Sequence, residues 1–159
     1  MNRSQKGFTL LEIIITLLVI ALVMSIAYPS LSRATASLSL RTTGRDILNT
    51  LRFAREKAVT EQIGMCVTID QENQLLQLTN DFGEGDRKYL LPDNVRIRRV
   101  YIGGTEPANG IATVHFLPNG SADAVEILIE SKTGAYLRIV SDPLSSGATI
   151  LNGSGEEIS

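Results

Sequence analysis

One apolar stretch decides the fold of this 159-residue chain: residues 8–27 read FTLLEIIITLLVIALVMSIA. Its 20 residues carry a single charge, that of Glu12, and residues 13–32 carry none. An α-helix of this length is roughly 30 Å long, which matches the hydrocarbon thickness of a bilayer. The stretch therefore predicts one helical membrane crossing and argues against a purely cytosolic globular protein.

The residues before this stretch, MNRSQKG, are polar and include two positive charges, Arg3 and Lys6. By the positive-inside rule, this end stays cytoplasmic and the rest of the chain lies across the membrane. Two interpretations follow. In one, the stretch is an export signal cleaved after the small-x-small sequence Ser25-Ile26-Ala27, which releases a secreted binding protein. In the other, the stretch is retained as an anchor.

Three features favour retention of the apolar stretch. Glu12 would cost about 2.5–3.5 kcal/mol at membrane depth, a penalty that an export signal has no reason to carry. Cleavage after Ala27 would place Pro29 beside the scissile bond, where proline makes a poor substrate. The helical pattern also continues past the membrane edge, into residues 30–62. We therefore expect an anchor.

Glu12 needs a positive partner, because an ionisable residue inside a membrane is a functional feature by default. A charge four residues earlier would lie on the same helical face, and that position is Phe8. Cleavage between Gly7 and Phe8 would create the charge as a free α-amino group. The spacing therefore predicts processing at this bond.

The segment 6–12, KGFTLLE, resembles the prepilin motif of type IV pilins and type II secretion pseudopilins. The resemblance implies that a membrane prepilin peptidase cuts after Gly7 and N-methylates the new terminal Phe8. It also implies that Glu12 pairs with the amino terminus of a neighbouring subunit during filament assembly.

Beyond the apolar stretch, small and apolar residues recur in steps of four and three. They predict an amphipathic helix with one buried stripe, formed by Leu40, Gly44, Ile47, Leu51, Ala54 and Ala58. One helix then runs over residues 8–61. Pro29 predicts a kink in it, the alternative being a proline tolerated at the membrane edge. Gly44 indicates close packing or a second bend.

After residue 62 the period changes from helical to alternating, which predicts strands. We expect them at 65–69, 75–79, 87–91, 95–101, 111–117, 124–130, 135–141 and, more weakly, 148–151. Val125, Ile127 and Ile129 should face the core, with Glu126 and Glu130 in solvent. The fold class is therefore α+β and pilin-like: a long N-terminal helix packed on a mostly antiparallel sheet or small sandwich. Its expected parts are a leader (1–7), a transmembrane or filament-core helix (8–29), an amphipathic stem (30–62) and a periplasmic β-rich head (63–159).

The segment 114–140 resembles the C-terminal β region of GspH/FimT minor pseudopilins and minor pilins. The matching pattern is a Phe-Leu-Pro-Asn-Gly turn at 116–120, a strand, a Thr-Gly turn at 133–134 and another strand. With the N-terminal motif, the resemblance covers nearly the whole chain.

The composition leaves little room for catalysis or for a bound cofactor. One histidine and one cysteine exclude His/Cys metal clusters, internal disulfides and CxxC motifs, and no hydrolase or nucleotide-binding motif occurs. We expect Cys66 to be a small buried hydrophobe, with an intermolecular disulfide as the alternative. We expect His115 to be either a packing residue or an ordinary surface residue. We therefore predict that the chain is not an enzyme and binds neither a cofactor nor a metal ion.

Two charged clusters in the head have alternative interpretations. Asp81, Glu84 and Asp86 lie in a Gly-rich loop that could suit Ca²⁺, although a solvated turn fits the poor ligand spacing better. Arg96, Arg98 and Arg99 could contact DNA or an acidic partner, but a solvated strand is favoured, with Arg96 and Arg98 on one face.

Charge is unevenly distributed along the chain. Residues 30–62 hold six basic and three acidic residues, whereas residues 63–159 hold 7 basic and 13 acidic ones. An acidic head disfavours nucleic acid, because contacts with phosphate supply most of the sequence-independent affinity.

The two resemblances together imply a GspH-like minor pseudopilin of the type II secretion system. Its expected partners are the prepilin peptidase and N-methyltransferase, other major and minor pseudopilins or pilins, the inner membrane and exported proteins. It would cross the bacterial inner membrane once, with its N-terminus in the cytoplasm and its head in the periplasm, and join a periplasmic pseudopilus.

A minor type IV pilin resembling FimT or FimU, acting in pilus assembly, adhesion or DNA uptake, is the alternative within this family. Pro29 favours it, since many type IV pilins have proline there. The acidic C-terminus SGEEIS departs from the arginine-bearing pattern of DNA-binding FimT proteins, which argues against DNA uptake.

Overall fold

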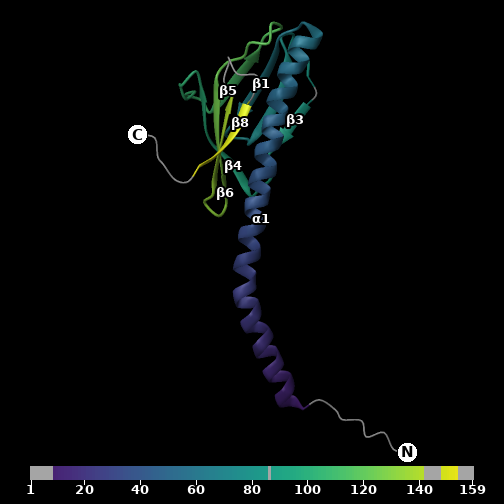
Figure 1. The fold of residues 1–159 in the computed structure, drawn as a ribbon, viewed down its shortest axis with the longest axis vertical. Coiled ribbons are helices and arrows are strands. Elements are labelled where there is room, and N and C mark those ends of the chain that lie inside the picture. Colours follow the sequence, from purple (N-terminus) through teal and green to yellow (C-terminus); the bar gives the residue numbers. More distant parts are fainter. Residues whose placement is uncertain (1–8, 86, 142–147, 154–159) are drawn as a thin grey trace, which may run out of the picture. The chain divides into compact units, whose positions relative to one another are not determined.

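The computed structural model describes residues 9–85, 87–141 and 148–153, of which 26–34 and 148–153 are described by their backbone alone. The chain divides into two compact units, Met1–Thr35 and Ala36–Ser159. Helix α1 (Leu10–Glu61) contributes to both units (Figure 1). The expected helix is therefore confirmed over its described length.

Helix α1 ends just before a residue with a left-handed backbone conformation. Gln62 adopts a φ of 56°, the left-handed conformation that commonly terminates helices. Its side-chain Nε2 donates a 2.7 Å hydrogen bond to the carbonyl oxygen of Val59, which would otherwise lack a partner within the helix. Gly64 then leads the chain directly into the first strand.

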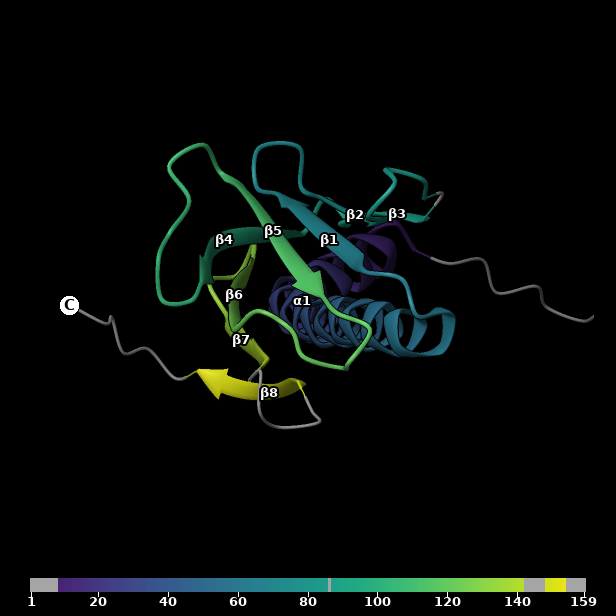
Figure 2. The same ribbon diagram turned by 90° about the horizontal axis from the view of Figure 1, so that it is seen from above.

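Every expected strand is present, with ends within one or two residues of the expected ones. Among the described residues they are β1 (Met65–Asp70), β2 (Leu75–Asn80), β3 (Arg87–Leu90), β4 (Val95–Ile102), β5 (Ile111–Phe116), β6 (Val125–Ser131), β7 (Tyr136–Ser141) and β8 (Ala148–Gly153). They form two four-stranded sheets with the orders β3-β2-β1-β5 and β4-β6-β7-β8. All pairings are antiparallel, and Figure 2 shows the two sheets beside α1.

The core lies between α1 and the inner faces of both sheets. All six residues of the predicted helical stripe are buried, joined by Ala36, Thr43 and Leu48. A Cβ added at Gly44 would overlap the Cδ2 atom of Leu137 on β7. Gly44 therefore permits close packing of helix on sheet, which is the first of its two predicted roles.

Strand β6 follows the predicted alternation. Val125, Ile127 and Ile129 are at most 2% exposed, whereas Glu126 and Glu130 are half-buried on the outer face. Both glutamates form ion pairs across the sheet. Arg138 Nε lies 3.1 Å from Glu126 Oε1, and Arg98 Nη1 lies 3.3 Å from Glu130 Oε2.

Strand β4 departs from simple alternation. A bulge between Ile97 and Arg99 makes Arg98 an extra residue, so that both Ile97 and Val100 point inward. Arg96, Arg98 and Arg99 are consequently all exposed. Strict alternation would have turned Arg99 toward the core beside Ile97.

The prediction that Cys66 is a buried hydrophobe is wrong. The alternation of β1 points Met65, Val67 and Ile69 into the core and leaves Cys66 half-buried on the outer face. Its Sγ donates a 3.8 Å hydrogen bond to Oδ1 of Asp81. Partial burial raises the pKa of the Cys66 thiol, and the nearby charge of Asp81 raises it further.

Candidate assembly site on the N-terminal helix

Thr9 and Glu12 define the start of α1. The backbone nitrogen of Glu12 donates to Thr9 Oγ1 at 3.3 Å and to the Thr9 carbonyl at 3.1 Å, so Thr9 is the N-cap. Glu12 occupies the third helical position, where the helix dipole favours a carboxylate. The Thr-x-x-Glu spacing is a capping signature, one that hydrophobic periodicity alone does not reveal. The cap and the helix dipole thus both favour a carboxylate at position 12.

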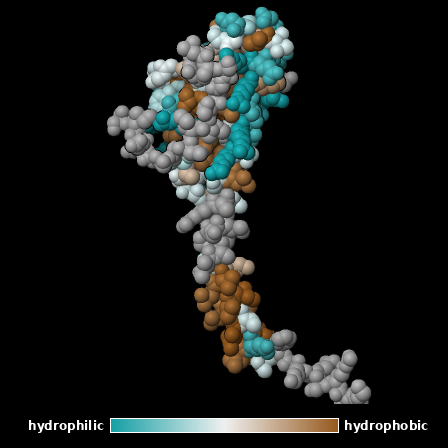
Figure 3. Space-filling model, in the orientation of Figure 1, coloured by the Kyte–Doolittle hydropathy of each residue, from teal (hydrophilic) through white to brown (hydrophobic). Residues whose placement is uncertain are grey.

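The apolar side chains on both sides of Glu12 are exposed. Their exposed fractions range from 47% to 77% for Leu10, Leu11, Ile13, Ile14, Ile15, Leu17, Leu18, Val19, Ile20, Leu22, Val23 and Met24. Figure 3 shows them gathered along the N-terminal part of α1. An apolar surface of this extent is typical of a helix that packs against other molecules. We refer to residues 10–24 as the apolar segment.

Among the described residues, no helix is both long enough and apolar enough to cross a membrane.

Three predicted site residues lie wholly or partly outside the part of the chain that the structure describes. Gly7 and Phe8 lie outside the described residues. The backbone stays helical through Pro29, but its side chain is not described. The predicted kink therefore stays a prediction.

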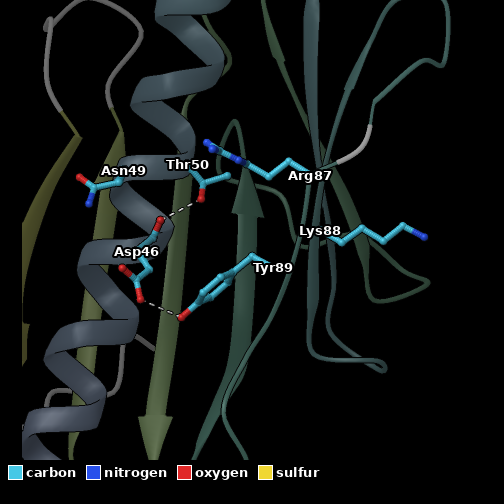
Figure 4. Close-up of a pocket in the computed structure, with 6 residues that line it drawn as sticks. All are labelled: Asp46, Asn49, Thr50, Arg87, Lys88 and Tyr89. Carbon is cyan, nitrogen blue, oxygen red and sulfur yellow. Dashed lines mark hydrogen bonds between the residues drawn. The ribbon is translucent and has the colours of Figure 1, made fainter.

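A groove of about 400 Å³ lies between α1 and the edge strand β3 (Figure 4). Tyr89 crosses it and donates a 3.1 Å hydrogen bond from its hydroxyl to Oδ2 of Asp46. Burial raises the pKa of Tyr89, and the Asp46 carboxylate adds to the rise. Arg87 stacks over Phe53, 4.4 Å from the ring centroid. These contacts hold β3 against α1. No pattern in the sequence predicted that the two elements would meet.

His115 and Asp123 form a surface pair. The Nδ1 atom of His115 lies 2.9 Å from Oδ2 of Asp123, which also accepts a 2.9 Å hydrogen bond from the His115 backbone nitrogen. Cys66 is the cross-strand neighbour of His115, but its thiol is directed to Asp81 and its pKa is raised, the opposite of an activated nucleophile. The arrangement therefore does not form a Cys-His catalytic pair.

The structure describes only two members of the acidic cluster, Asp81 and Glu84. Glu84 accepts a 3.3 Å hydrogen bond from Asn80, Asp81 binds Cys66, and Asp86 lies outside the described residues. In the described part of the chain, no group of three or more His, Cys, Asp or Glu side chains could hold a metal ion.

Comparison with known proteins identifies the N-terminal segment. Residues 2–28 match the prokaryotic N-terminal methylation motif. No curated protein sequence matches the chain.

The fold matches two solved structures of the minor pseudopilin EpsH from the type II secretion system of Vibrio cholerae. One has a TM-score of 0.60 at 14% identity and covers 75% of this chain and 99% of that one. The other has a TM-score of 0.59 at 15% identity and covers 75% and 97%. This chain therefore combines a prepilin-type N-terminus with a pseudopilin fold. The predicted α+β, pilin-like fold class is confirmed.

Proposed function

We propose that this protein is a minor pseudopilin that the type II secretion system assembles into a periplasmic pseudopilus. One observation carries the proposal: a methylation motif at residues 2–28 and a head with the fold of EpsH occur in the same chain. The role is structural rather than catalytic. Its partners are the prepilin peptidase and the other pseudopilins, with exported proteins as cargo.

Assembly would begin with cleavage between Gly7 and Phe8 and N-methylation of Phe8. The apolar segment first anchors the chain in the inner membrane, with the head in the periplasm. In the filament, the same side chains pack against helices of neighbouring subunits. Glu12 then meets the new amino terminus of a neighbour, which neutralises a carboxylate that is costly in lipid.

Intact mass spectrometry of the membrane-extracted protein tests the processing step. The expected chain begins at Phe8 and carries one methyl group. A chain beginning at Tyr28 would instead support a secreted binding protein with a cleaved export signal. Replacement of Gly7 by a bulkier residue should leave the leader attached, while the matched variant Gln5→Ala should be processed normally.

Glu12→Ala separates processing from assembly. The variant should be cleaved and should remain in the membrane, because its apolar segment has lost its only charge. It should be depleted from sheared filaments, whereas Glu12→Asp should be depleted less. Equal incorporation of Glu12→Ala and the unchanged protein would contradict the role of Glu12.

A minor type IV pilin is the second candidate, favoured by Pro29. Deletion of the gene distinguishes the two. Loss of exoprotein release supports secretion, whereas loss of twitching or transformation supports a pilus. Retention of all three activities would contradict both.

A further inference from the structure

Three arginines form a line on the exposed side of α1 within the second unit. Arg41, Arg45 and Arg52 are all exposed, and their spacing of four and seven residues places them within a sector of about 40° around the helix axis. We call these residues the arginine stripe. It lies on the same helix as the apolar segment.

Two members of the arginine stripe, Arg41 and Arg45, are not neutralised by the described residues of their own helix. Arg41 and Arg45 are like charges one turn apart, a spacing that slightly destabilises a helix. Neither forms a hydrogen bond or ion pair with another described residue. Asp46, the carboxylate that directly follows Arg45, instead accepts a hydrogen bond from the Tyr89 hydroxyl.

The head has the opposite charge balance. Residues 63–159 hold 13 acidic and 7 basic residues, against three acidic and six basic ones in residues 30–62. A chain with a basic helix and an acidic head is complementary to other subunits of the same design. We propose that the arginine stripe docks, through Arg41 and Arg45, against carboxylate side chains of a neighbouring subunit in the assembled filament.

This inference rests on the proposed function, since it requires a filament. A protein partner fits better than a nucleic acid, because a polyanion as large as DNA would also meet the acidic head and be repelled. A protein surface can present a few carboxylates at the spacing of the arginines, with bidentate hydrogen bonds to each guanidinium.

Photo-crosslinking in living cells tests the proposal. Leu38, 67% exposed and one turn before the stripe, is replaced by p-benzoylphenylalanine in the full-length chain. After irradiation, the adduct should contain another filament subunit, and mass spectrometry should map it to a segment bearing Asp or Glu. The double variant Arg41→Glu/Arg45→Glu should lower the adduct yield roughly tenfold. Reversal of the mapped carboxylates to lysine should restore it.

Matched variants control for folding and total charge. Arg96→Glu/Lys132→Glu makes the same charge change at exposed positions on and beside the β4 sheet and should leave the yield unchanged. Arg41→Gln/Arg45→Gln removes the charges without reversal and should give an intermediate loss. Circular dichroism should show equal melting temperatures for all variants.

Several results would overturn the proposal: a yield unaffected by Arg41→Glu/Arg45→Glu, an adduct on a segment without carboxylates, or an adduct on nucleic acid or lipid. Intact mass and filament fractionation of the same cells separate this failure from that of the proposed function. A chain that is processed at Phe8 and present in filaments, yet forms no adduct, overturns only the proposal about the arginine stripe. An unprocessed chain absent from filaments overturns both.

Discussion

Tyr89 on β3 donates a hydrogen bond of 3.1 Å to the carboxylate of Asp46 on α1, residues that lie 43 positions apart in the sequence. The contact holds an edge strand of only four residues against the helix. Tyr89 is half-buried, so its ring also covers part of the groove between the two elements.

Tyr89→Phe should lower the free energy of unfolding by about 0.5–1.5 kcal/mol, because the ring is kept and only the hydrogen bond is lost. Urea denaturation of the full-length protein in mild detergent measures the change. The matched variant Tyr136→Phe, on an exposed residue of β7, should change it by less. An equal or smaller effect at Tyr89 would contradict a stabilising role for this contact.

The same pair predicts a loss of stability at high pH. The pKa of Tyr89 is raised above its ordinary value of 10.0 in the folded state, so the folded protein holds the phenolic proton more tightly than the unfolded chain does. The corresponding stability is complete below pH 10 and declines as the pH rises through the folded pKa. Denaturation midpoints measured from pH 8 to 11 should therefore fall less in Tyr89→Phe than in the unchanged protein.

Gly44→Ala should destabilise the head by about 1 kcal/mol. The new methyl group gains roughly 1 kcal/mol of helix propensity but overlaps Leu137, and overpacking of a core costs about 1–3 kcal/mol. A double-mutant cycle with Leu137→Ala should show coupling, because the smaller residue makes room for the methyl group. Additive effects, or a higher melting temperature for Gly44→Ala, would contradict the close approach.

Asp81→Asn should accelerate alkylation of Cys66. Burial contributes most to the raised pKa of the thiol, and the charge and hydrogen bond of Asp81 follow. Removal of that charge lowers the pKa and increases the thiolate fraction, which is the reactive form. Iodoacetamide labelling at pH 8, followed by mass spectrometry, measures the rate. Asp70→Asn, at the opposite end of β1, is the control and should leave the rate unchanged.

Sequence periodicity predicted the fold well because each element follows from local rules. Apolar residues that recur every three or four positions predicted the buried face of α1. Alternation of apolar and polar residues predicted every strand, including the inward-facing Val125, Ile127 and Ile129. Alternation was misapplied at Cys66, where an apolar run was taken as wholly buried. It also missed the β4 bulge, since an extra residue leaves no mark in the residue pattern.

The predicted site was partly accessible from sequence for a similar reason. The prepilin motif is contiguous, so its residues could be named from their order alone. The cap at Thr9 follows from a local Thr-x-x-Glu spacing. By contrast, Asp123 became the partner of His115 only because the chain folds back after β5, and nothing in the spacing of the two residues indicated it.

By itself, the sequence determined the helix, the strands and the prepilin-type N-terminus, because hydrophobic periodicity and a contiguous motif act over a few residues. Only the tertiary structure decided which side chains meet across elements: Tyr89 with Asp46, Leu137 against Gly44 and Asp81 with Cys66. It also decided that Arg41 and Arg45 have no partner among the described residues. Such pairings depend on how two sheets and a helix share one core, and no local pattern encodes that arrangement.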